Sequence, residues 1–279
     1  MTMVSRSSII LLANRDPRPL APISESVPPP LLPIGGKPII GHLLELIQKM
    51  GTPNISIVVH GSDQLTQAFI QKNWTNIAIV KEPITFSERA SLVIRADVVP
   101  PLAKTEKLLA DIGKDLAPLV EDDDFGLWFV RAGKRVPNYI DLEKDFVGDD
   151  RLLPNLHSYM RVAFAAAIGA LPEIETLARL DVFGHPARVL TKCRPGVGGA
   201  IGLGAFIDRD VVLGERVIVG EGAMIGARSH LESTIVLPGS LVTPDSNLRK
   251  CIVSPEWVFE LEGGHAQRLC RHQRYEECA

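Results

Sequence analysis

The sequence predicts a doubly wound, mostly parallel α/β sheet followed by a parallel β-helix. Its 279 residues are enough for about two domains, because a single core stops growing well near this size. Continuous apolar runs alternate with helical patterns in the first part, and aliphatic residues recur at every sixth position in the last third. We therefore expect an α/β domain over 1–185, a repeat domain over 186–255 and a C-terminal tail over 256–279.

The composition indicates a folded protein and excludes several classes of partner. Hydrophobic residues make up 46% and charged residues 23%, which are ordinary globular values. The net charge of −3 gives no general attraction to nucleic acid or to anionic membranes. No apolar run is long enough for a membrane helix and no signal-peptide pattern opens the chain, so a cytoplasmic location is expected. Four scattered cysteines without a CxxC pair indicate neither a disulfide framework nor a zinc site.

The first part of the chain alternates strand and helix patterns. The expected strands cover 7–13, 55–59, 77–80 and 92–94, and the expected helices cover 37–50, 64–72 and 156–170. Continuous apolar runs such as those of the first two strands are typical of a parallel sheet covered on both faces. Pro38 suits the first turn of the first helix and Gly51 follows its end. The elements therefore form β-loop-α-β units.

The last third contains a six-residue repeat without a slip. Its members are Ile201, Ile207, Leu213, Val219, Ile225, Leu231 and Leu237. A period of six fits neither an α-helix nor a plain strand, but it fits a short strand followed by a turn, three of which close one coil. The positions four residues further on complete the interior and are Ala205, Val211, Val217, Ala223, Ser229, Ile235 and Leu241.

Glycine follows the aliphatic residue in four repeats, at Gly202, Gly214, Gly220 and Gly226. We expect these glycines at tight corners, where a positive φ favours glycine. The pattern resembles the hexapeptide-repeat left-handed β-helix, and the handedness is implied by that resemblance alone. Such domains assemble through their faces and ends, so a homo-oligomer or a hetero-complex through the β-helix is expected.

The most specific motif lies between the first strand and the first helix. LLPIGGKPII, at 31–40, strongly resembles the nucleotide-sugar pyrophosphorylase (sugar-1-phosphate nucleotidylyltransferase) family. In that family the first strand leads into LAGGxGTRLxPLT and then PKxLLPxGGKPxI, and many members append a hexapeptide-repeat domain. The mannose-1-phosphate guanylyltransferase-like branch is the most similar. The resemblance implies a nucleotide or nucleotide-sugar ligand and in-line attack of a sugar 1-phosphate on a nucleoside triphosphate, with release of pyrophosphate.

The resemblance carries site residues over to this chain one by one. It implies nucleotide-binding positions at Leu12, Ala13 and Asn14, catalytic positions at Arg15, Arg18 and Lys37, and a Mg²⁺ ligand at Asp97. The arginines and the lysine would balance phosphate charge, and Asp97 occupies the place of the metal-binding aspartate in SLVIRADVV.

Other residues depart from the family pattern. The paired glycines of the phosphate loop are replaced by Asn14 and Arg15, and the lysine expected after Pro28 is Pro29, which has neither charge nor amide proton. These changes predict a degenerate member that binds weakly or regulates a partner in the supply of activated sugars for polysaccharide. The alternatives are an active nucleotidylyltransferase and a hexapeptide acyltransferase with His185 or His230 as general base.

Overall fold

The structure is a computed structural model, and its described part comprises residues 8–13, 17–49, 54–59, 63–80, 91–96, 121–122, 127–130, 155–167, 188–189 and 199–269. The chain divides into two compact units. The first comprises Met1–Pro17, Pro28–Leu32 and Pro38–Leu153, and the second comprises Arg18–Val27, Pro33–Lys37 and Pro154–Ala279. Because both sides of the expected boundary at residue 185 lie outside the described residues, that boundary stays a prediction.

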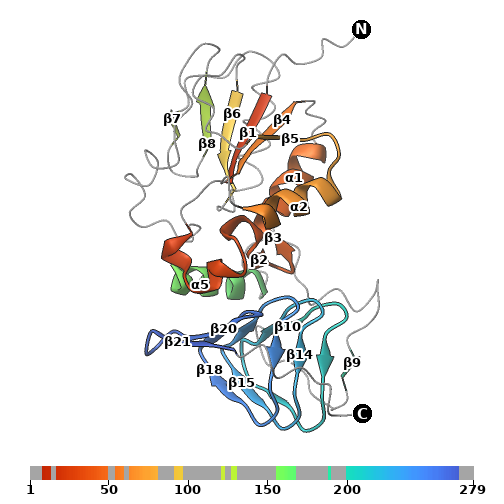
Figure 1. Cartoon of the computed structure of the whole chain (residues 1–279), viewed down its shortest axis with the longest axis vertical. Helices are drawn as coiled ribbons and strands as arrows, with labels where there is room; N and C mark the ends of the chain where they lie inside the picture. The colour runs from red at the N-terminus through yellow and green to blue at the C-terminus, as the bar shows by residue number, and fades with distance from the viewer. Residues whose placement is uncertain are drawn as a thin grey trace. The chain divides into compact units, whose positions relative to one another are not determined.

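A six-stranded sheet in the order β5-β4-β1-β6-β8-β7 forms the centre of the first unit (Figure 1). Its strands are β1 (Ser8–Ala13), β4 (Ile55–Val59), β5 (Ala78–Val80), β6 (Ser91–Arg95), β7 (Glu121–Asp122) and β8 (Leu127–Val130). Strands β5, β4, β1 and β6 are parallel to one another, whereas β8 pairs antiparallel with β6 and β7 pairs antiparallel with β8. The predicted mostly parallel sheet and its four strands are confirmed.

Two helices, α1 (Ile39–Lys49) and α2 (Gln64–Asn73), connect β1 to β4 and β4 to β5. Both pack into one core cluster with the same face of the sheet, and this cluster includes Leu11, Leu43 and Ile57. Residues of the opposite face are buried as well, among them Leu12 and Val93. The sheet is therefore buried on both faces, while the doubly wound arrangement of helices stays a prediction.

The start of the first helix differs from the sequence prediction. Lys37 and Pro38 form strand β3, which pairs with β2 (Pro33–Ile34) in a two-stranded hairpin. Pairing keeps their backbone extended, so the helix begins only at Ile39 and Pro38 lies before its first turn. Among the residues that the structure describes, no helix is both long and apolar enough to cross a membrane.

The last predicted helix is confirmed as α5 (Leu156–Ala167), which belongs to the second unit. Its Tyr159 is fully buried and donates a hydrogen bond from its hydroxyl to the carbonyl oxygen of Pro33, at 3.0 Å. Burial raises the pKa of the Tyr159 phenol, because the charged form would lose its hydration. This contact fixes α5 to the strand β2 within the same unit.

The C-terminal part of the second unit is β-helix-like, as predicted. Its short strands are β9 (Arg188–Val189), β10 (Ala200–Ile201), β11 (Phe206–Ile207), β12 (Val212–Leu213), β13 (Ile218–Val219), β14 (Met224–Ile225), β15 (His230–Glu232), β16 (Ile235–Val236), β17 (Leu241–Val242), β18 (Asn247–Arg249) and β19 (Cys251–Val253). They stack in three sheets, in the orders β10-β13-β16-β19, β17-β14-β11-β9 and β12-β15-β18. Each parallel pair joins one coil to the next (Figure 1).

A hairpin of β20 (Trp257–Glu260) and β21 (His265–Arg268) follows the last coil. Strand β20 pairs antiparallel with β19, and β21 pairs antiparallel with β20. The hairpin therefore extends one of the three sheets beyond the coils. The first half of the expected tail over 256–279 is thus ordered β-structure.

The repeat slips between Leu231 and Val236, contrary to the prediction, and it slips again between Leu248 and Val253. Val219 lies in register with Val236 and not with Leu237, so the residue that follows Leu231 in the interior is only five positions further on. The shortened turn contains Ser233, whose φ is 48°. Because of the first slip, the prediction that Ile235 and Leu241 fill the interior is wrong, and their places are taken by the preceding residues.

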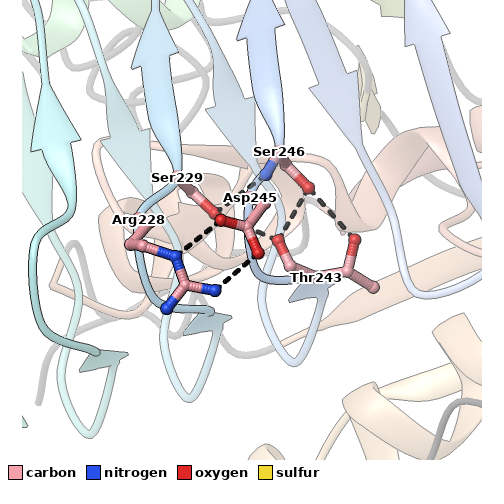
Figure 2. Close-up of polar contacts among 5 residues, drawn as sticks. All are labelled: Arg228, Ser229, Thr243, Asp245 and Ser246. Atoms are coloured by element: carbon pink, nitrogen blue, oxygen red, sulfur yellow. Dashed lines mark hydrogen bonds and ion pairs between the residues drawn. The ribbon is translucent and has the colours of Figure 1, made fainter.

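Hydroxyl groups lie inside the later coils: Ser229 at a predicted interior position, and Thr234 and Ser240 at positions that the slip after Leu231 moves into the interior. Ser229, Thr234 and Ser240 are buried and donate hydrogen bonds to carbonyl oxygens, at 3.0 Å to Thr243, 2.9 Å to Glu232 and 3.3 Å to Val253, respectively. Figure 2 shows the first of these contacts beside Ser246, whose backbone N–H donates to Ser229 Oγ. Hydrogen bonding offsets the cost of burying these hydroxyls and links neighbouring turns.

The corners of the coils also differ from the prediction, since Gly202, Gly214, Gly220 and Gly226 are not in the left-handed region. The left-handed corners are Gly204, Asp210, Arg216, Gly222, Arg228, Ser233, Gly239, Asp245 and Lys250. Gly220 is needed for another reason, because a Cβ there would lie 2.5 Å from the backbone nitrogen of Pro238. Close approach of successive coils, and not a positive φ, therefore requires this glycine.

Candidate functional site

The order of strands defines a switch point between β1 and β6. The chain passes from β1 to β4 and β5 on one side, and β6 then pairs with the other side of β1. In open α/β sheets ligands bind outside the carboxyl ends of the strands at such a point. The carboxyl ends of β1 and β6 are therefore the candidate site.

Two predicted nucleotide-binding residues lie at this edge. Leu12 is in register with Arg95 of β6, and Ala13 is in register with Val59 of β4. The backbone N–H of Ala96 donates to the carbonyl oxygen of Leu12 at 2.9 Å, so β1 and β6 remain paired up to their carboxyl ends. The side chains of Leu12 and Ala13 are buried, so at these two positions only backbone groups are left for contact with a ligand.

Three predicted site residues lie outside the described residues: Asn14, Arg15 and Asp97. In the sequence, Asn14 directly follows β1 and Asp97 follows Ala96 at the end of β6. The assignments of nucleotide binding, catalysis and metal binding to these residues therefore stay predictions. In the described part of the chain, no group of three or more His, Cys, Asp or Glu residues is arranged to hold a metal ion.

Arg18 and Lys37 belong to the second unit, whereas Leu12 and Ala13 belong to the first. Arg18 lies exposed in the 3₁₀ helix η1 (Arg18–Leu20), and Lys37 is half-buried in β3. The two glycines of the GGK motif, Gly35 and Gly36, have φ of 60° and 90° and form the tight turn between β2 and β3. The motif that resembles the family thus forms a hairpin here.

Pro29 occupies the position where the resemblance expects a phosphate-binding lysine. It begins the 3₁₀ helix η3 (Pro29–Leu31), and both Pro29 and Pro30 are buried. A buried proline offers a phosphate neither a charge nor an N–H group. Pro29 therefore cannot make the phosphate contact that the resemblance places at this position.

Sequence reasoning missed Arg95, the last residue of β6. Its side chain is only 4% exposed, and its neighbours Ile94 and Ala96 face the core that contains α1. Alternation along the strand places Arg95 on the other face of the sheet, next to Leu12. The signal was present in the sequence as a charge inside the apolar segment SLVIRA, but the predicted strand stopped one residue before it.

The other candidate reactive side chains are His230, His185 and Cys251, and none of them is placed in a described ligand site. His230 lies exposed on β15, in register with Val212 and Asn247. His185 lies outside the described residues. Cys251 is buried, its thiol donates to the carbonyl oxygen of Arg249 at 3.2 Å, and burial raises its pKa, so it has the character of a structural thiol.

Two hollows in the second unit contain neither Arg18 nor Lys37. One, beside Tyr159 and Gly220, has a volume of about 20 Å³, which is room for about one water molecule. The other is an open groove of about 350 Å³ between β18 and the β20–β21 hairpin, lined by Arg249, Glu260 and His265 among others. The carboxyl edge of the first sheet remains the candidate ligand site.

The sequence was also compared with known proteins. No family model matches the chain, and no curated protein matches it. The resemblance over 31–40 is therefore an argument for a proposal about function, and it does not assign the chain to a family.

Proposed function

We propose that the chain binds a nucleotide or nucleotide sugar on a nucleotidyltransferase-like scaffold that has lost part of its phosphate loop, and that it acts as a weak binder or regulatory subunit. The observation that carries the proposal is the buried Pro29 in place of the expected lysine. A cytoplasmic role in the supply of activated sugars for polysaccharide fits the resemblance.

The argument depends on what nucleotidyl transfer requires. Such a reaction needs little covalent help from the protein, but it needs the phosphates to be positioned and their charge neutralised. Pro29 contributes to neither requirement, whereas the switch point beside Leu12 and Ala13 keeps the backbone edge on which a nucleotide would rest. Binding without efficient turnover is the expected result.

A second candidate is an active nucleotidylyltransferase with altered residue roles. It is favoured by the position of Asp97, which follows the end of β6 at the switch point. In this case Asp97 would hold Mg²⁺, which supplies charge neutralisation, while Arg15, Arg18 and Lys37 would bind phosphates.

Pyrophosphate release separates the two candidates. The full-length chain would be incubated with Mg²⁺ and pairs of nucleoside triphosphates and sugar 1-phosphates. We expect no turnover, together with a rise in melting temperature with one or more nucleotides. Turnover that is lost in Asp97→Ala would establish the active enzyme instead. A melting temperature that responds to no nucleotide or nucleotide sugar would contradict the binding proposal.

We also propose that the repeat is a left-handed β-helix and that the protein assembles through it, as a homo-oligomer or with a partner. The resemblance to hexapeptide-repeat domains supports both statements. Light scattering of the purified chain tests the homo-oligomer directly. A monomer at all concentrations would leave the hetero-complex, which is tested by co-purification at a defined stoichiometry.

A further inference from the structure

A permanently charged side chain is buried at the switch point. Arg95 is 4% exposed, and a guanidinium stays protonated at every pH that a folded protein experiences. A buried arginine at a sheet edge where ligands bind is therefore a candidate for anion recognition.

The surroundings of Arg95 strengthen this interpretation. The face of the sheet that carries Arg95 also carries Leu12 and Val58, whose side chains are buried and apolar. At the opposite end of the same face, the hydroxyls of Ser8 and Ser91 form a neutral hydrogen bond of 2.6 Å. Positive charge on this face is thus placed at the carboxyl end, where low polarity strengthens attraction to an anion.

The chemistry of the guanidinium suits a phosphate. Arginine has five N–H donors in a planar fork, which matches two oxygens of one phosphate group. Arg95 also interacts with other groups of the chain. Because a guanidinium has five N–H donors, some of them can contact the protein while others bind an anion. In contrast, the position where the resemblance expects a lysine carries no charge, because it is occupied by Pro29.

We propose that Arg95 is the anion-binding residue of the switch-point site and that it receives a phosphate group of the ligand in place of the missing lysine. The ligand class, a phosphorylated nucleotide or nucleotide sugar, rests on the proposed function. The smallest probe of the anion site itself is inorganic pyrophosphate.

The test measures binding by calorimetry to the full-length chain, with pyrophosphate and with ADP, GDP and UDP. The variants are Arg95→Lys, which keeps the charge but loses the fork, and Arg95→Met, which loses both. We expect about 10-fold weaker binding of the anions by Arg95→Lys and a greater loss by Arg95→Met. Arg228→Gln, which removes an exposed arginine from the second unit, is the matched control and leaves binding unchanged.

The outcomes separate this proposal from the proposed function. If nucleotides bind and Arg95→Lys binds them as the wild type does, the role of Arg95 is wrong while the binding function stands. If pyrophosphate binds through Arg95 and no nucleotide or nucleotide sugar does, the anion site stands and the binding function is wrong. If the wild type binds no probe, both are wrong.

A measurement on the wild type covers the case in which the variants fail to fold. The Nε–H resonance of Arg95, assigned through its own backbone, should shift on addition of pyrophosphate at concentrations that saturate binding. An unchanged resonance under saturating pyrophosphate would overturn the assignment.

Discussion

Arg228 and Asp245 form a two-pronged ion pair at neighbouring corners of the coils. Arg228 Nε donates to Asp245 Oδ1 and its Nη2 donates to Oδ2, each at 2.7 Å (Figure 2). Both residues have a left-handed backbone, with φ of 58° and 61°. The hydrogen bonds from Arg228 lower the pKa of the Asp245 carboxyl. At each of these two residues, both the ion pair and the left-handed backbone conformation can therefore affect the stability of the coils.

Two substitutions of Asp245 separate these contributions. Asp245→Asn removes the charge but keeps a residue that tolerates positive φ, whereas Asp245→Ala loses both. Because the pair is exposed, we expect Asp245→Asn to melt close to the wild type and Asp245→Ala to melt a few degrees lower. Equal melting temperatures of the two variants in thermal unfolding would show that the backbone conformation is not strained.

The pair also predicts an acid dependence. A carboxyl whose folded pKa is lowered stabilises the protein above its unfolded pKa of about 3.9, and this contribution is lost as the pH falls through the folded value. The melting temperature of the wild type should consequently fall more steeply than that of Asp245→Asn below about pH 4. Parallel acid profiles of the two proteins would contradict this linkage.

At the scale of elements, Gly220 tests the spacing of the coils. In Gly220→Ala the new Cβ would lie 2.5 Å from the nitrogen of Pro238 and 2.7 Å from the carbonyl carbon of Leu237, and neither backbone atom can move freely. We expect destabilisation of about 1–3 kcal/mol in urea unfolding. Gly222→Asn is the control, because Gly222 has φ of 64° and open space around it, and asparagine tolerates this conformation. A control that unfolds as early as Gly220→Ala would contradict the steric explanation.

Tyr159 tests the attachment of α5 to β2. Tyr159→Phe removes the hydrogen bond to Pro33, so a loss of about 1 kcal/mol is expected at neutral pH. A phenol whose folded pKa is raised destabilises the fold as the pH rises above its unfolded pKa of about 10, because the unfolded chain releases the proton first. The wild type should therefore lose stability above this pH more steeply than Tyr159→Phe. Identical alkaline unfolding profiles would contradict burial of the phenol.

The element scale also shows what the sequence can and cannot predict. Apolar runs predicted the strands β1 and β4, and helical spacing predicted most of the helix α1, because local burial patterns determine such elements. The slip at Ser233 was not predictable, since Leu237 continues the six-residue spacing and only pairing between coils shows that Val236 is in register. Arg95 was missed because its position beside Leu12 at the carboxyl end of the sheet follows only from the pairing of β6 with β1.

At the scale of the whole molecule, the two units have separate hydrophobic cores. Leu44 is fully buried in the core of the sheet and α1, and Ile225 is fully buried in the core of the coils. Each substitution to alanine is expected to cost about 2–5 kcal/mol. Separate cores predict two transitions in calorimetry, with Leu44→Ala lowering the melting temperature of one and Ile225→Ala lowering that of the other.

Because the proposed anion site lies at the carboxyl edge of the first sheet, pyrophosphate should raise the melting temperature of only the transition that Leu44→Ala lowers. A single transition lowered by both substitutions would show that the units unfold as one, and a ligand shift confined to the transition lowered by Ile225→Ala would place binding in the second unit.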